Sequence, residues 1–228
     1  MAPDASATNP ETHRSNARIA GIVLIATSLA SILLMAHHPH ASSQGAAEVA
    51  VEIAAKAQIS RIVHGALIAM IGAQVFAFIE LCRLLDWNRA AVRAGFVAYA
   101  AGAGAMSGAA LISGFLVSAL GTRYASLPAA DVEVFPHLLR LSMAGNQVLA
   151  NFGVIAMSIG ILAWSIALLR PPRGNAWIGA IGLIAGLAPA IALASGALVL
   201  DVRGMTLVVV CQTVWNLAVG IQLVRAKF

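Results

Sequence analysis

Residues 146–168, NQVLANFGVIAMSIGILAWSIAL, decide the fold class of this chain. The stretch contains no Asp, Glu, Lys or Arg. As a helix rising about 1.5 Å per residue it would extend about 35 Å, enough to cross the ~30 Å hydrocarbon core of a bilayer. An apolar stretch of this length therefore predicts a transmembrane helix.

The remainder of the chain has the same character. Of the 228 residues, 60% are hydrophobic and 10% are charged, whereas a soluble domain is about one quarter charged. We predict an all-α bundle of six transmembrane helices that forms a single domain over residues 18–228. Residues 1–17 are polar without a hydrophobic period, which predicts a disordered cytoplasmic tail. The six predicted spans are 18–37, 60–82, 94–120, 138–169, 176–199 and 204–224.

Lys and Arg residues predict the orientation of the bundle. Nine of them fall on the side of the two termini and five on the other side, so the positive-inside rule places both termini in the cytoplasm of a bacterial-type inner membrane. The net charge of +5 then belongs to cytoplasmic loops next to the lipid bilayer, and we expect no nucleic-acid partner. The apolar run Ile19–Ala36 is longer than the ~7–15 residues of a signal-peptide core, which favours a retained first helix.

Two helices are predicted to project beyond the outer face of the membrane. The sequence after Ala46 favours helix and contains Glu52 and Lys56 at i,i+4, a stabilising ion-pair spacing. The helix of the fourth span is predicted to begin at FPHLLR, residues 135–140, because Pro136 suits a first helical turn.

Histidines gather on the predicted outer side. His37, His38 and His40 follow the first span in MAHHPHASS, residues 35–43, while His64 and His137 lie near the outer ends of the second and fourth helices. Imidazole is the commonest protein ligand of transition metals, so these five residues predict a metal site. A haem ligated by His64 and His137 is the second candidate ligand, after a single metal ion. The alternative is a set of interfacial histidines that bind water and lipid headgroups.

Polar side chains also continue into the membrane. Arg140, Gln147 and Asn151 share one helical face with His137. Polar groups in hydrocarbon need partners, so they point into the bundle. They predict either a polar pocket that opens outward or a set of interhelical hydrogen bonds. The other expected members are Gln74, Gln212 and Asn216.

Small residues predict close helix contacts. Gly104 and Gly108 form one G-x-x-x-G motif, and Gly182 and Gly186 form another. Such motifs let helix backbones approach, either inside this bundle or against a second copy or another membrane partner. Enzyme motifs are weak: no intramembrane-protease G-x-S-G serine and no H-x-x-x-H pair is present, so enzymatic activity stays open.

Three stretches carry a resemblance to other proteins: LLMAHHPH at 33–40, RIVHGALIAMIG at 61–72, and the opening stretch at 146–168. On these the chain resembles a loose group of small, uncharacterised bacterial multi-pass inner-membrane proteins. The resemblance covers most of the first four spans and implies no activity, cofactor or catalytic residue.

These observations lead to one preferred function and two alternatives. The preferred function is an integral inner-membrane protein of unknown activity whose outward-facing His cluster binds a metal ion or another small ligand. The first alternative is a non-catalytic structural or assembly subunit. The second is a small-solute transporter, against which the lack of an inverted repeat and of buried charge pairs counts.

Overall fold

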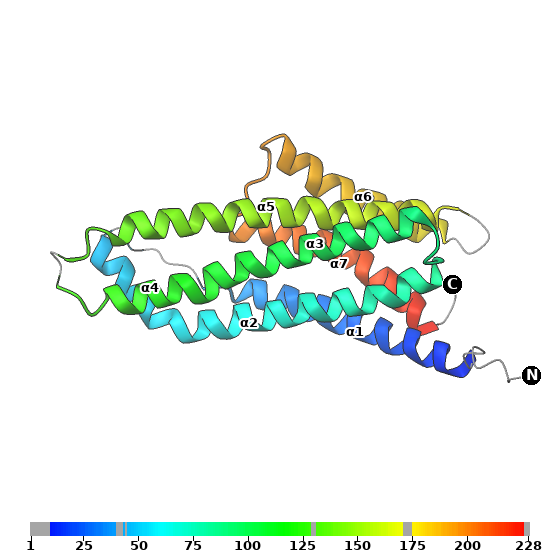
Figure 1. The fold of residues 1–228 in the computed structure, drawn as a ribbon, viewed down its shortest axis with the longest axis horizontal. Coiled ribbons are helices and arrows are strands. Elements are labelled where there is room, and N and C mark those ends of the chain that lie inside the picture. The colour runs from blue at the N-terminus through cyan, green and yellow to red at the C-terminus, as the bar shows by residue number, and fades with distance from the viewer. Residues whose placement is uncertain (1–9, 40–42, 44, 129–130, 171–174, 226–228) are drawn as a thin grey trace, which may run out of the picture.

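The computed structural model describes residues 10–39, 43, 45–128, 131–170 and 175–225 (Figure 1). These residues form helices and contain no β-strand. Six helices are long and apolar enough to cross a membrane. The chain is therefore an all-α, multi-pass integral membrane protein, as predicted. The helices are α1 (Pro10–Ala36), α2 (Ala46–Leu84), α3 (Ala90–Leu111) continued by η1 (Ile112–Leu116) and α4 (Val117–Tyr124), α5 (Phe135–Leu168), α6 (Ala176–Ala194) and α7 (Val202–Arg225).

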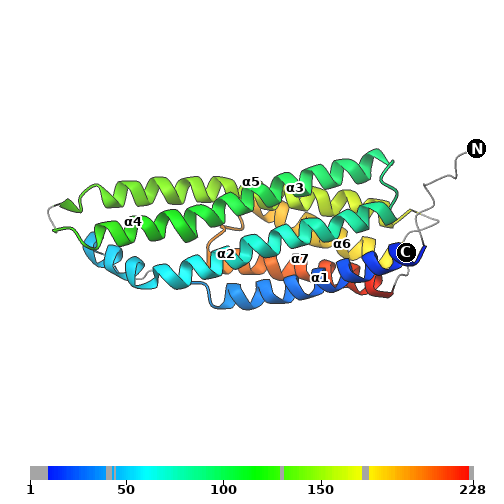
Figure 2. The same cartoon turned by 60° about the horizontal axis from the view of Figure 1, so that its bottom comes forward.

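The helices lie roughly antiparallel, and the two termini emerge at the same end of the bundle (Figures 1 and 2). At the other end α2, α4 and α5 extend beyond the remaining helices (Figure 1). The predicted starts at Ala46 and Phe135 are confirmed, with Pro136 in the first turn of α5. Lys56 also pairs with Glu52 at 2.7 Å, as predicted from their spacing.

Some boundaries differ from the predicted ones. α1 begins at Pro10, so the segment expected to be a disordered tail is helical from that residue onward, and residues 1–9 lie outside the described part. α6 ends at Ala194, earlier than the predicted 199, and the chain turns at Gly196 with φ of 74°. The third span contains the π-helical turn η1, which was not predicted.

Polar and apolar side chains are distributed as expected for a protein in lipid. Large apolar side chains are exposed on the outer faces of the helices, for example Leu141 (72%) and Val148 (67%). Several polar side chains are buried inside the bundle instead: Ser28, His64, Gln74, Ser158, Ser165, Gln212, Thr213, Asn216 and Gln222. Hydrocarbon offers polar groups no partner, so they gather between helices.

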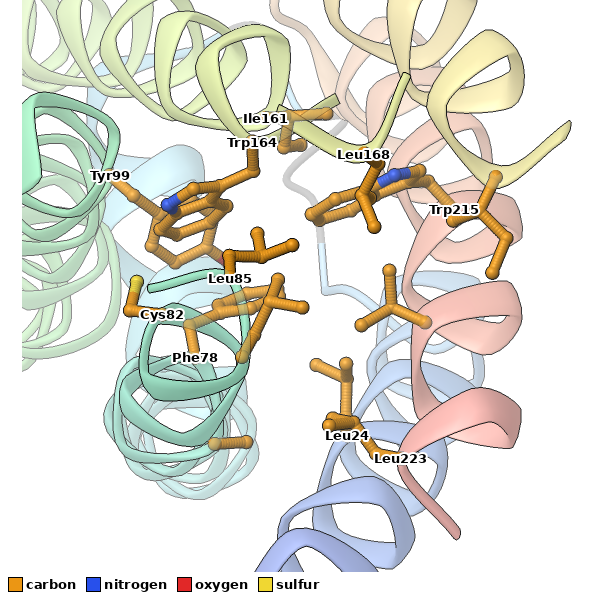
Figure 3. Packing of buried hydrophobic residues seen from close by; sticks show 14 of the residues in the cluster. Leu24, Phe78, Cys82, Leu85, Tyr99, Ile161, Trp164, Leu168, Trp215 and Leu223 are labelled. Atoms are coloured by element: carbon orange, nitrogen blue, oxygen red, sulfur yellow. The ribbon is translucent and has the colours of Figure 1, made fainter. Parts of the chain in front are cut away.

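An aromatic cluster fills the half of the bundle nearer the termini (Figure 3). Trp164 and Trp215 stack with an interplanar angle of 6°, and Phe78 lies within 4.8 Å of the Trp164 ring centroid. Tyr99 packs against Phe78 at 4.6 Å. The indole nitrogen of Trp164 donates to the carbonyl of Val92 at 3.2 Å. The four rings come from α2, α3, α5 and α7 and tie these helices together.

Glycines allow the closest helix contacts. A β-carbon at Gly102 would meet the backbone of Gly153 on α5, and one at Gly182 would meet Ser165 and Trp215. Gly186 lies against Leu162 of α5, so the α6 motif packs inside the bundle. Gly104 has open space around it, and its predicted role as a partner surface stays a prediction.

Candidate functional site

A cavity of about 340 Å³ lies between α1, α2, α3, α5 and α7, on the side of the aromatic cluster away from the termini. Its volume is in the range of small-molecule sites, about 300–1,000 Å³. Most of its wall is apolar. The polar lining residues fall into two groups. One, around His38 and His64, lies at the end of the cavity away from the chain termini, here called the outer end. The other, around Gln74, Gln212 and Asn216, lies next to the aromatic cluster, here called the inner end.

His38 and His64 meet at the outer end. Their Nε2 atoms are 3.1 Å apart, and their rings are edge to face with centroids 4.7 Å apart. His64 is 4% exposed. His38 lies two residues beyond the end of α1, and His64 is in α2, so the pair joins the exit of one helix to the interior of the next.

The hydrogen bond made by His64 Nδ1 determines which ring nitrogen carries the hydrogen. Nδ1 lies 2.8 Å from the backbone carbonyl oxygen of Ser60. A carbonyl oxygen can only accept, so Nδ1 carries the hydrogen and donates it. In the neutral ring Nε2 then presents a lone pair to His38. A backbone carbonyl orients metal-binding histidines in the same way.

The π-helical turn η1 shapes the wall beside His64. Gly114 of η1 packs directly against the His64 side chain, and a β-carbon there would overlap it. The neighbouring Ser113 donates to Asn146 Oδ1 on α5 at 3.0 Å, and both line the cavity. π-helical turns occur mostly as single bulges at functional sites. At this turn the chain places Gly114, which has no side chain, next to the His64 ring, and the imidazole occupies the space left free.

The remaining histidines lie elsewhere. His37 is exposed and its Nδ1 contacts the carbonyl of Leu33 at 2.8 Å. His137 is exposed near the start of α5, nine residues and about 13 Å of helix from Asn146. Neither lines the cavity, and the pairing of His64 with His137 that a haem would need is not formed. His40 lies outside the described residues. Among those described, no three His, Cys, Asp or Glu side chains are grouped to hold a metal ion.

The inner end carries a hydrogen-bond network across four helices. Tyr99 donates from its hydroxyl to Gln74 Oε1 at 3.2 Å, and Gln74 Nε2 donates to Ser28 Oγ at 3.5 Å. Asn216 Nδ2 donates to the same Ser28 oxygen at 3.1 Å. Two buried atoms next to this network have no hydrogen-bond partner, Gln212 Nε2 and Asn216 Oδ1.

The polar face predicted on the fourth helix lies outside the cavity. Arg140 is exposed, and Gln147 donates to Asn151 Oδ1 at 3.0 Å. This bond gives the Gln147 amide nitrogen and the Asn151 carbonyl oxygen a partner on their own helix. The α5 face that does line the cavity is offset by one residue and consists of Met143, Asn146, Ala150, Val154 and Met157. Of the predicted pocket residues, Gln74, Gln212 and Asn216 do line it.

Methionine is unusually common in this wall. The chain has seven methionines, and five of them line the cavity: Met35, Met106, Met143, Met157 and Met205. Met35 is 5% exposed, and its carbonyl accepts from the His38 backbone nitrogen at 3.2 Å. Thioether sulfur is a soft metal ligand, so these methionines add to the ligands that the histidine side chains offer.

The cavity stops at the aromatic cluster. One turn beyond Gln74 on α2 is Phe78, which is fully buried, and Trp215 beside Asn216 is also fully buried. The site is therefore a pocket with a histidine pair at its outer end, an amide network at its inner end and a methionine-rich wall between them. Neither the known protein-family models nor the curated proteins nor the solved structures contain a match to this chain.

Proposed function

We propose that this chain is an inner-membrane protein that binds a transition-metal ion between His38 and His64, on the extracytoplasmic side. The observation that supports it best is the 3.1 Å separation of the two Nε2 atoms, combined with the Ser60 carbonyl that holds the His64 lone pair toward His38. In the contact seen here His38 Nε2 donates its hydrogen to the His64 lone pair. To bind an ion, neutral His38 would carry that hydrogen on Nδ1, so that both Nε2 lone pairs are available as ligands.

The spacing suits one ion. Metal–imidazole bonds are about 2.0–2.1 Å long, so two nitrogens 3.1 Å apart subtend an angle of about 98° at a shared ion. That angle lies between octahedral and tetrahedral values.

The wall favours a soft ion. Imidazole accepts several first-row metals, but thioether sulfur selects monovalent copper. Met35 lies three residues before His38, is 5% exposed and lines the cavity. Its thioether would complete the coordination of copper(I) supplied from outside. The Lys and Arg pattern supports a cytoplasmic location for both termini, and this end of the cavity would then face outward.

The test uses protein expressed without a His tag, purified in detergent and loaded with copper(I) under reducing conditions. Elemental analysis and competition with a colorimetric copper(I) chelator give stoichiometry and affinity. We expect one ion per chain, with binding weakened at least about tenfold in His38→Gln and His64→Gln. Met35→Leu, which removes the sulfur and keeps the bulk, should weaken binding less.

Matched variants separate a site from surface adsorption. His37→Gln and His137→Gln remove exposed histidines, and Met157→Leu removes a thioether near Gly102, far from the histidine pair. All three should keep copper affinity unchanged. If His64→Gln lowers thermal stability but the wild-type protein holds no copper, zinc or other metal, the histidines only pack, and the chain is better described as a structural membrane subunit.

A further inference from the structure

The inner end of the cavity carries a second site, formed by unpaired amide atoms. Gln212 is 8% exposed and Asn216 is 4% exposed, yet Gln212 Nε2 and Asn216 Oδ1 have no hydrogen-bond partner. Leaving such a group unpaired in a protein interior costs about 1–3 kcal/mol. Both residues line the cavity, and as i and i+4 neighbours on α7 they share one face.

The surrounding network determines which atom of Asn216 is left without a hydrogen-bond partner. Tyr99 donates to Gln74 Oε1, which leaves Gln74 Nε2 to donate to Ser28. Asn216 uses its own Nδ2 on the same Ser28 oxygen, so its carbonyl oxygen is the free group. The inner end therefore offers one donor, from Gln212, and one acceptor, from Asn216.

The environment of these atoms selects an uncharged ligand. The one carboxylate in the lining is Asp201, eleven residues and about 16 Å of helix from Gln212, and its Oδ1 already accepts from the Gly204 backbone nitrogen at 2.7 Å. No Lys or Arg lines the cavity. The wall beside the two amides is apolar, including Val154, Val208 and Val209.

We infer that the inner end binds a neutral molecule with an apolar body and a hydroxyl group. A hydroxyl accepts one hydrogen bond and donates one, which matches Gln212 Nε2 and Asn216 Oδ1 together. The apolar body lies along the methionine and valine wall toward the outer end. This inference does not depend on a metal ion at His38 and His64, because the two groups of polar residues are at opposite ends of the cavity.

The experiment compares two photoreactive probes in the full-length protein in nanodiscs. One is a diazirine derivative of 1-decanol, and the other is its methyl ether, which accepts a hydrogen bond but cannot donate one. Peptide mapping by mass spectrometry should locate alcohol labelling on the cavity faces of α5 and α7. The ether should label at least about tenfold less, the cost of about one unpaired buried group.

Variants test the assignment to the two amides. Gln212→Leu and Asn216→Leu should reduce alcohol labelling to the level of the ether. Gln222→Leu is the matched control, because Gln222 is also buried on α7 with an unpaired Oε1 but does not line the cavity. Near-ultraviolet circular dichroism of the Trp164 and Trp215 pair reports whether each variant folds.

Competition identifies the source of the hydroxyl. Displacement by 1-decanol indicates a free alcohol, and displacement by dioleoylglycerol indicates a lipid headgroup; both support the site. Equal labelling by alcohol and ether in the wild-type protein overturns the inference without the need for any variant. Equal losses in Gln212→Leu and Gln222→Leu overturn it as well. Copper binding in His64→Gln is measured separately, so failure of one proposal leaves the other standing.

Discussion

Replacing Gly114 by Ala tests the contact that positions His64. A β-carbon at Gly114 would lie 2.6 Å from His64 Cγ and 3.0 Å from its Nδ1, whereas carbon atoms in good contact are about 3.5–4.0 Å apart. Roughly 1 Å of overlap must be relieved by moving α2 away from η1. Overpacking of this kind costs about 1–3 kcal/mol.

A second substitution calibrates this cost. Ala in place of Gly stabilises a helix interior by about 0.5–1 kcal/mol. At Gly145, on the facing helix α5, the nearest atom to an added β-carbon is Ile112 Cδ1 at an ordinary 3.6 Å. Gly145→Ala should therefore gain stability. Gly114→Ala has the same gain but also the overpacking cost, so it should be about 1–3 kcal/mol less stable than Gly145→Ala.

The assay is reversible unfolding in mixed micelles of increasing SDS fraction, followed by circular dichroism. Gly114→Ala should unfold at a lower SDS fraction than the wild-type protein, and Gly145→Ala at an equal or higher one. Gly114→Ala should also weaken copper(I) binding, because the displaced imidazole leaves His38. Equal unfolding midpoints for the two variants would refute the packing of His64 against η1.

Three further predictions concern the rest of the bundle. Tyr99→Phe removes the hydroxyl that donates to Gln74 at 3.2 Å; it should cost about 0.5–1.5 kcal/mol, and a double-mutant cycle with Gln74→Leu should show the two losses to be non-additive. Phe78→Ala leaves a hole among fully buried rings and should lower the SDS midpoint by the equivalent of about 3–5 kcal/mol. Gln147→Ala breaks only its bond to Asn151 and should cost less than about 1 kcal/mol; a change in copper or alcohol binding would show that the predicted α5 face does reach the cavity.

The fold could be predicted because lipid imposes a simple rule on sequence. A helix must have about 20 apolar residues to cross hydrocarbon, and the six such segments were visible without a structure. The early starts of α2 and α5 were also visible, since Glu52, Lys56 and Pro136 indicate helix before the apolar segments begin. The π-helical turn was not visible, because one extra residue in a helix leaves no periodic signal.

The site could be predicted only in part. His64, Gln74, Gln212 and Asn216 were recognised because polar side chains in apolar segments are conspicuous, whereas Met143 and Met205 looked like ordinary hydrophobic residues. The α5 face that lines the cavity is offset by one residue, about 100° of rotation, from the predicted face. A face of His, Arg and Gln can be solvated or can form hydrogen bonds along its own helix, as Gln147 does to Asn151.

The shortness of α6 has a consequence for how this protein responds to its lipid. With 19 residues α6 extends about 28 Å, which is close to the ~30 Å thickness of an average hydrocarbon core. α2 has 39 residues and is about twice as long. In a thicker bilayer α6 is therefore the first helix to be shorter than the hydrocarbon core. The segment that follows α6 includes Leu200 and Asp201, which line the cavity. We therefore expect a change in bilayer thickness to act on the segment that carries these two lining residues.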